Sequence, residues 1–383
     1  DFAVKIFNIK LNKFNLSLIF VLIFLIFFKS PCSFYLGRSE NGLEVFFDYA
    51  SSNSFFKSIL YVYSEAKYYE LFVNFSAIIV NWVSLPSFLI TVYFALIVKL
   101  ILIFYIFFSN SILLKTTLHK FIFASFTIYS TAITPEIWLT TLQSKVFFGM
   151  LSFIMIFQNF SKFDKKKFII YRGALILNGL SSIFSSIFSI VYFFIYVKER
   201  SRINFYNFIF SLIPLLVNFF IFLYFSLKNL AENDRFTFEL EKIFNLVYNT
   251  SVRPIFGGNL SKLFYEKIAF LDIKFSLLFL SLALIGIFFY YLIKKSDKIL
   301  NLLFISFAIN ILLILLGSQY SDFVGGRYAA LSSVIFLTFF LRLIQIEKNP
   351  IFYNFSIILI SISLVMGLIE FKYFNPWMFL LKC

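Results

Sequence analysis

The sequence predicts an all-α fold: a polytopic transmembrane helix bundle of about eleven spans, forming a single integral membrane domain over residues 1–383. Of the residues, 61% are hydrophobic and only 14% are charged. Apolar runs of membrane-spanning length recur along the chain, and a water-soluble fold cannot bury that much apolar surface. The net charge of +15 does not indicate a nucleic-acid partner, because Lys and Arg cluster beside apolar segments, where they set topology. The predicted surroundings are membrane lipids.

The first third of the chain predicts one span, a large outer loop and a second span. The apolar run at 16–28 follows three lysines, so we expect a retained first span that runs outward from the inner side. Residues 29–70 carry mixed charge and are the first outer loop. Pro86 divides residues 71–108 into an interfacial helix and a span that returns inside.

The middle third predicts a hairpin of two short helices. A short third span at 121–133 stops on the outer side, and a fourth span returns to a strongly basic inner loop. The next apolar stretch is interrupted by Asn178-Gly179-Leu180-Ser181-Ser182. Because broken helices at membrane depth survive only inside protein or beside a wet cavity, we expect this tip to be buried. The basic residues that flank the hairpin are Lys162, Lys165, Lys166, Lys167, Arg172, Lys198, Arg200 and Arg202.

The last part predicts five spans and a second outer loop. A span at 205–227 leads to the loop at 228–274, in which Pro254 and Gly257-Gly258 exclude one continuous helix. Four further spans are expected at 275–293, 299–316, 328–343 and 351–369. Lys294, Lys295, Lys298 and Lys348 mark the inner side between them.

Several polar features fall on the outer side, although they are scattered along the chain. Asp48 lies between aromatic residues, Glu136 follows a proline with Gln143 beyond it, Asn178 lies at the hairpin tip, and Arg327 follows two glycines. Their convergence on one face predicts a site. The alternatives are a solvated Asp48, a Glu136 that compensates a helix dipole and an Arg327 that extends to the interface.

Other residues predict no catalytic chemistry. The only histidine, His119, lies beside Lys120 on the inner side, and we expect a structural role for it. The two cysteines, Cys32 and Cys383, are too few for a metal site or a disulfide framework, although both are expected outside and a single bridge between them stays open.

Three segments carry a resemblance to a known family. They are Thr134-Pro135-Glu136-Ile137-Trp138-Leu139-Thr140-Thr141-Leu142-Gln143-Ser144, Leu177-Asn178-Gly179-Leu180-Ser181-Ser182 and Gly325-Gly326-Arg327-Tyr328-Ala329-Ala330-Leu331. Together, over roughly residues 45–345, they resemble bacterial membrane proteins related to the GT-C glycosyltransferases.

The resemblance implies transfer of a sugar from a polyprenyl-phosphate donor at the outer face of the membrane. It implies catalytic roles for Asp48 and Glu136, a phosphate-binding Arg327, and a divalent cation near the acids. Tyr328, Gln143 and Asn178 would complete the substrate-binding residues. The chain departs from the family because the adjacent acidic pair of the first loop is missing and Asp48 lies far from the first span.

The leading hypothesis is therefore a glycosyltransferase-like protein of a bacterial inner (plasma) membrane that acts on a lipid-linked sugar donor. Two alternatives remain open. One is a non-catalytic structural subunit of a membrane complex with membrane-protein partners, encoded by an AT-rich organellar genome and located in an organellar inner membrane, since Phe alone accounts for 61 residues. The other is a transporter or flippase of lipid-linked glycans, which would need no catalytic carboxylate.

Overall fold

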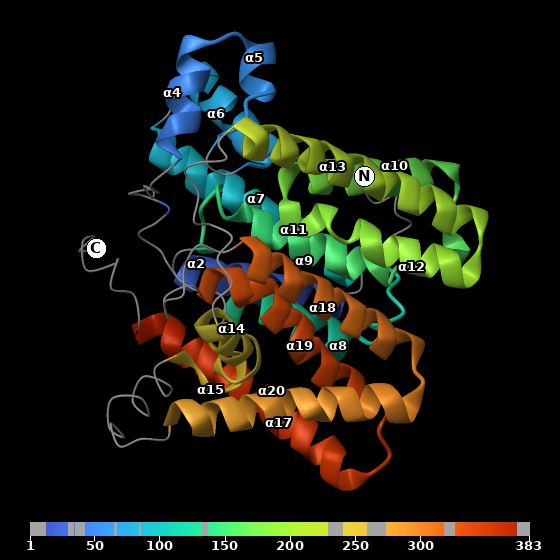
Figure 1. The fold of residues 1–383 in the computed structure, drawn as a ribbon. Helices are drawn as coiled ribbons and strands as arrows, with labels where there is room; N and C mark the ends of the chain where they lie inside the picture. Colours follow the sequence, from blue (N-terminus) through green and yellow to red (C-terminus); the bar gives the residue numbers. More distant parts are fainter. Residues whose placement is uncertain are drawn as a thin grey trace. The chain divides into compact units, whose positions relative to one another are not determined.

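The computed structural model describes residues 13–29, 34, 43–64, 67–83, 86–131, 137–228, 240–258, 273–317 and 326–373. These residues form helices and turns, with one β-bridge between Ser111 and Gln158 and no strand among them (Figure 1). The predicted all-α class is confirmed for this part of the chain. Two compact units are present and are described separately. Unit 1 comprises residues 1–117, 136–233 and 383, and unit 2 comprises 118–135 and 234–382. A single domain stays a prediction.

Six helices of the described residues are long and apolar enough to cross a membrane. They are α7 (Ser87–Phe108), α13 (Arg202–Lys228), α17 (Ile273–Lys295), α18 (Lys298–Gly317), α19 (Gly326–Ile346) and α20 (Pro350–Tyr373). All six coincide with predicted spans to within a few residues, and they support a membrane protein. The predicted total of about eleven spans is not confirmed. The apolar helices α6 (Leu71–Val83) and α9 (Ser144–Ile156) are only about 20 Å long, shorter than the hydrocarbon core.

The segment predicted as the first outer loop contains a small helical layer of its own. In unit 1, α2 (Lys13–Lys29) packs on α7, whereas α4 (Glu44–Ser52) and α5 (Phe55–Ile59) pack on α6. The contact is apolar because Phe46 and Ala50 of α4 meet Val73 and Ala77 of α6 in one buried cluster. The first loop is therefore a folded layer, which the sequence analysis did not anticipate.

The short-helix hairpin is present, and its helices are interrupted at Ser182 and again at residues 187–188. After the 3-10 turn η2 (Phe160–Lys162), the hairpin consists of α10 (Lys165–Ser181), the single turn α11 (Ile183–Ser186) and α12 (Ser189–Glu199). Asn178 and Gly179 lie inside α10. The expected break over 178–182 is thus corrected to Ser182, whose side chain accepts a hydrogen bond from the N–H of Ser185 and caps α11.

The burial predicted for this tip is confirmed. The exposed fraction is 4% for Asn178, 5% for Ser181 and 0% for Ser182. A Cβ at Gly179 would collide with the ring of Pro214 in α13, so glycine is what allows α10 and α13 to approach closely here. The tip therefore lies against protein, as an interrupted helix at membrane depth requires.

Unit 2 surrounds two helices that the sequence placed in an outer loop. Helix α14 (Leu240–Ser251) packs on α17 and α19, and α15 (Arg253–Phe256) packs on α20. Between them, Ser251 and Val252 are 0% and 2% exposed. The chain turns at Gly257, whose φ of 83° is in the left-handed region. Helix α8 (Thr117–Tyr129) belongs to this unit, where its last residue meets α20 at Gly367.

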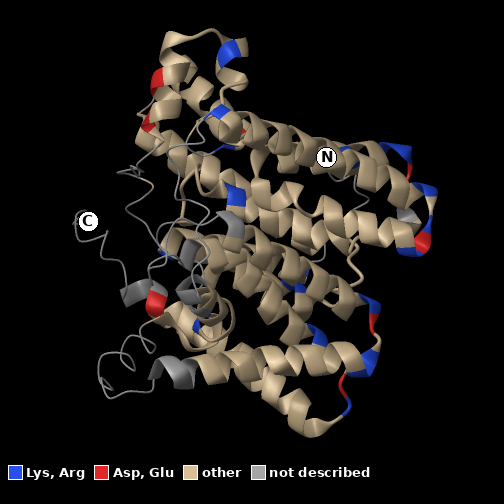
Figure 2. Cartoon of the chain, viewed as in Figure 1, with Lys and Arg blue, Asp and Glu red and all other residues tan. Residues whose placement is uncertain are grey.

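Charged residues gather at helix ends in both units (Figure 2). The basic residues around the start of α10 and the α12–α13 connection lie at one end of unit 1, because α10 and α13 run parallel while α12 runs antiparallel to α13. The α17–α18 and α19–α20 connections likewise carry the basic residues of unit 2. Within each unit, this grouping is what the preference of Lys and Arg for the inner side would produce.

Candidate functional site

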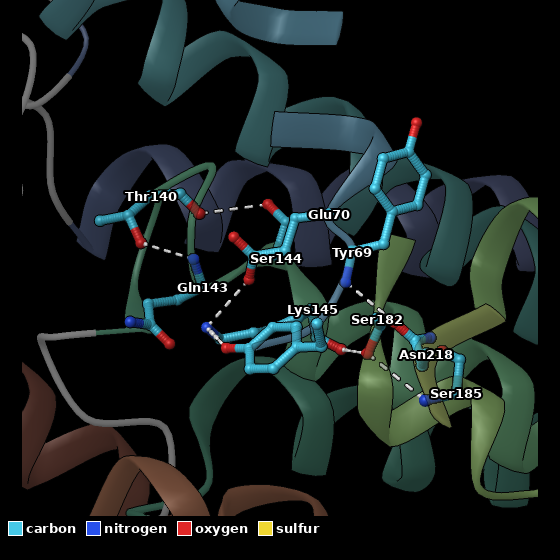
Figure 3. A network of polar contacts seen from close by, with 10 residues as sticks. Tyr69, Glu70, Thr140, Gln143, Ser144, Lys145, Ser182, Ser185 and Asn218 are labelled. Atoms are coloured by element: carbon cyan, nitrogen blue, oxygen red, sulfur yellow. Dashed lines mark hydrogen bonds and ion pairs between the residues drawn. The ribbon is translucent and has the colours of Figure 1, made fainter. Parts of the chain in front are cut away.

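A buried ion pair lies at the start of two apolar helices of unit 1 (Figure 3). Lys145 Nζ, in the first turn of α9, lies 3.1 Å from Glu70 Oε1 and donates a 2.7 Å hydrogen bond to the hydroxyl of Tyr68. The side chains are only 12% (Lys145) and 2% (Glu70) exposed. Glu70 Oε2 is buried and accepts no hydrogen bond from the described residues. The pair thus holds a carboxylate with one oxygen engaged and one available.

Hydrogen bonds to backbone atoms join this pair to the hairpin tip and to α13. Ser182 Oγ donates to the carbonyl of Lys145 at 2.6 Å. The N–H of Tyr69 donates to Asn218 Oδ1 at 2.9 Å, and Asn218 Nδ2 donates to the carbonyl of Gly179 at 3.3 Å. Four separate chain segments therefore fix the position of Glu70 and Lys145 (Figure 3).

Two lysines meet at one tryptophan ring in the same unit. Lys99, in the middle of α7, is 1% exposed, and its Nζ lies 4.2 Å from the ring centroid of Trp138 and 3.3 Å from that of Phe147. Lys29, the last residue of α2, places its Nζ 4.0 Å from the Trp138 centroid. The ring faces attract both cations, and the result is a concentration of positive charge beside a buried indole.

The turn that carries Trp138 is held by its own polar residues. Leu139 adopts a φ of 48°, an uncommon value for a branched residue. The hydroxyl of Thr141 donates to the carbonyl of Thr91 in α7 at 2.9 Å, and the hydroxyl of Ser144 donates to the carbonyl of Thr140 at 3.1 Å. These bonds fix the turn against α7, so Trp138 reaches the lysines from a fixed backbone.

Three of the predicted site residues lie in the described part of unit 1. Asp48 is exposed on α4, and no hydrogen bond or ion pair joins its carboxylate to the described residues. Gln143 and Asn178 are 5% and 4% exposed. The N–H of Gln143 donates to Thr140 Oγ1 at 3.4 Å, and Asn178 Nδ2 donates to the sulfur of Met155 at 3.4 Å. Both side chains are packed into protein, and their role in substrate binding stays a prediction.

The other predicted residues lie elsewhere. Tyr328 is half-buried in the first turn of α19 in unit 2. Glu136 and the side chain of Arg327 lie outside the described residues. That Asp48, Glu136 and Arg327 face one groove therefore stays a prediction. Within the described ranges, no group of three or more His, Cys, Asp and Glu is placed to hold a metal ion, and the divalent cation also stays a prediction.

Unit 2 carries a separate polar cluster around α14 and α15. Arg253 Nη1 donates to Asn249 Oδ1 at 3.0 Å, and the Arg253 carbonyl accepts from the hydroxyl of Thr131 at 2.6 Å. Ser333 of α19 donates to the carbonyl of Asn249 at 2.9 Å, while Ser363 of α20 donates to that of Pro254 at 2.5 Å. These bonds supply donors to the buried backbone carbonyls around the α14–α15 junction, which would otherwise be costly to bury.

A second network lies at the α17–α18 connection of unit 2. Arg342 Nη2 lies 2.7 Å from Asp297 Oδ2, and Arg342 Nη1 donates to Gln345 Oε1 at 2.8 Å. Gln345 Nε2 is 3.3 Å from His119 Nδ1, so the only histidine lies in this network. Burial acts to raise the pKa of Asp297, but its hydrogen bonds to Arg342 and to the N–H of Leu300 outweigh it and hold the pKa below its usual range.

Sequence reasoning missed most of the charged residues that lie together in unit 1. Lys99 and Lys145 are single charges within or beside apolar runs, a pattern that does not identify a partner for either. Glu70 was one of several acids of the first loop. The available signal was that Glu70 and Lys145 each lie at the start of an apolar helix, at positions where opposite charges can pair.

Comparison with protein-family models, with curated proteins and with solved structures finds no significant match to this chain.

Proposed function

We propose that this chain is a membrane glycosyltransferase-like protein that transfers a sugar from a polyprenyl-phosphate donor at the outer face of the membrane. The supporting observation is the convergence of Lys29 and Lys99 on Trp138. Charged side chains within apolar helices are costly and usually mark a substrate pathway. Two ammonium groups beside an aromatic ring suit a donor that joins a phosphate to a sugar, since the cations attract the phosphate and the ring face packs on the sugar.

The carboxylates of unit 1 supply the other half of the chemistry. Transfer to a hydroxyl acceptor needs an anionic oxygen that removes the proton or holds a cation that does so. Asp48 and Glu136 are the candidates from the sequence, and Glu70 joins them because its Oε2 is buried and accepts no hydrogen bond from the described residues. Arg327 remains the phosphate-binding residue that the resemblance implies, with Tyr328, Gln143 and Asn178 as further substrate-binding candidates.

The experiment measures donor binding and sugar transfer separately. Full-length protein in nanodiscs is incubated with a panel of labelled polyprenyl-phosphate sugars and an acceptor extract. Lys99→Met is expected to weaken donor binding by about tenfold, the loss of one charge-assisted contact, while Lys99→Arg retains more of it. Asp48→Asn, Glu70→Gln and Arg327→Ala are expected to abolish transfer, and the matched control Glu44→Gln, on the same exposed helix as Asp48, is expected to transfer normally.

The buried lysine of α7 also favours one rival, a flippase of lipid-linked glycans. A flippase would bind the same donor through the same positive charge without using a carboxylate. Two results together would favour the flippase over the transferase. The protein would bind the donor normally but transfer no sugar to any acceptor extract, and Asp48→Asn and Glu70→Gln would leave lipid translocation unchanged. If no donor binds, the hypothesis of a non-catalytic structural subunit of a membrane complex would replace both.

A further inference from the structure

The seam between α10 and α13 in unit 1 carries a partly buried guanidinium. Arg172 of α10 donates from Nε to Asn207 Oδ1 of α13 at 3.4 Å. Its guanidinium carbon lies 5.1 Å from the ring centroid of Phe168 and 5.0 Å from that of Tyr206. These contacts orient the planar group along the seam. Neither Nη1 nor Nη2 donates a hydrogen bond to any described residue, so the bidentate edge is available.

The amide of Asn207 beside it has one donor without an acceptor. Asn207 is 1% exposed, and its Nδ2 donates to no acceptor in the described part of the chain. An amide donor buried in this way costs free energy unless a ligand supplies an acceptor. Because Asn207 Oδ1 already accepts from Arg172, the free donor of this amide adjoins the free edge of the guanidinium. Both groups favour the same kind of ligand, an anionic oxygen.

The charge and the surface around the seam indicate where that oxygen comes from. Arg172 lies seven residues into α10, roughly 10 Å along the helix from its start. Around that start a basic rim surrounds the seam. Exposed apolar side chains on the same stretch of α10 and α13, such as Ile169 (70% exposed) and Tyr206 (48%), favour acyl chains beside the seam. The rim consists of Lys165, Lys166, Lys167, Lys198, Arg200 and Arg202, with Asp164 and Glu199 as its acids (Figure 2).

We propose that the α10–α13 seam binds the headgroup phosphate of an anionic phospholipid from the inner leaflet, through Arg172 and the amide of Asn207. The guanidinium binds two phosphate oxygens, the amide donates to one of them, and the basic rim attracts the anionic surface. The acyl chains stay in hydrocarbon against the apolar side chains of α10 and α13. This site differs from the cluster around Trp138 and does not depend on the proposed transferase function.

The test uses full-length protein in a neutral detergent with phosphatidylglycerol, phosphatidylcholine or inorganic phosphate added separately, followed by native mass spectrometry and thermal unfolding. We expect phosphatidylglycerol to bind and raise the unfolding midpoint, and the other two to have little effect. Arg172→Gln is expected to weaken phosphatidylglycerol binding by about tenfold, as expected for loss of a charge-assisted contact. Lys228→Gln, which removes one charge from the far end of α13, is the matched control and should bind normally.

Three results would overturn the proposal: unchanged phosphatidylglycerol binding by Arg172→Gln, an equal loss in Lys228→Gln, or a midpoint shift with inorganic phosphate as large as with the lipid. The last would indicate a site for free phosphate. If Arg172→Gln does not fold, Asn207→Ala replaces it, since that change keeps the charge and removes only the amide. Phosphatidylglycerol binding by Asn207→Ala at the wild-type level would then overturn the proposal.

Discussion

Lys145→Met should destabilise the protein far more than the loss of one surface lysine. The change leaves the Glu70 carboxylate in a position that is 2% exposed, with its ion-pair partner gone. Removal of one member of a buried pair costs about 3–5 kcal/mol. Because Lys145 itself keeps 12% of its side chain exposed, some water reaches the pair, and we expect a cost near the lower end, about 3 kcal/mol.

A double-mutant cycle separates the pair from the packing around it. Glu70→Leu alone should also destabilise, since it leaves the Lys145 ammonium buried. The combination Glu70→Leu with Lys145→Met should fall within about 1 kcal/mol of wild type, because apolar residues of similar volume often replace a buried pair without loss. Unfolding by denaturant in detergent micelles measures all four proteins. Lys228→Met, an exposed lysine of α13, is the control and should change little.

Additive costs of the two single changes would refute this reasoning, because they would mean that the two charges do not interact. Single costs below about 1 kcal/mol, the median worth of a surface ion pair, would refute it as well, since they would place the pair in water rather than in the protein.

Two further predictions concern unit 2. Gly367→Ala should lower stability by about 1–3 kcal/mol, because the added Cβ would collide with the backbone of Tyr129. In the control Gly286→Ala the added Cβ meets no atom within 4 Å, so this change should be neutral or slightly stabilising in a helix. Equal losses of stability in the two variants, measured by thermal unfolding, would contradict the packing argument. The pKa of Asp297 is lower in the folded protein than in the unfolded chain. This difference stabilises the fold at pH values above the unfolded-state pKa, and the stabilisation is lost as the pH falls through the folded-state pKa. Wild type should therefore lose stability as the pH falls below about 4 more steeply than Asp297→Asn, and parallel pH profiles of the unfolding midpoint would contradict this.

The long apolar helices could be predicted because hydropathy acts over a whole span. Helices α13, α17, α18, α19 and α20 all begin and end within a few residues of their expected bounds. Hydropathy averaged over a whole membrane span is little affected by single polar residues, and the basic residues at the ends of the spans locate the connections. The short hairpin was predictable for a related reason, since neither half was long enough to span.

The candidate site could be predicted only in part, because pairing depends on tertiary contacts. Asp48 and Glu70 are both acids of one loop. Glu70 differs locally in that it precedes an apolar run, but this position alone does not establish that its side chain is buried. The distinction depends on Lys145, which lies 75 residues beyond Glu70. The helices α14 and α15 were missed because their polar residues are typical of a loop. In the fold, Ser333 of α19 and Ser363 of α20 donate to the backbone carbonyls of Asn249 and Pro254.

The contact between Gly367 and Tyr129 has a consequence for how the protein is made. Helix α8 leaves the ribosome about 240 residues before the part of α20 that contacts it, which corresponds to roughly 12 to 50 s of synthesis. The same holds for α14 and α15, whose neighbours α17, α19 and α20 are all synthesised after them. The final packing of unit 2 must therefore await its last helix, and a nascent chain halted before α20 should hold α8 in an environment that a membrane insertase or chaperone has to protect.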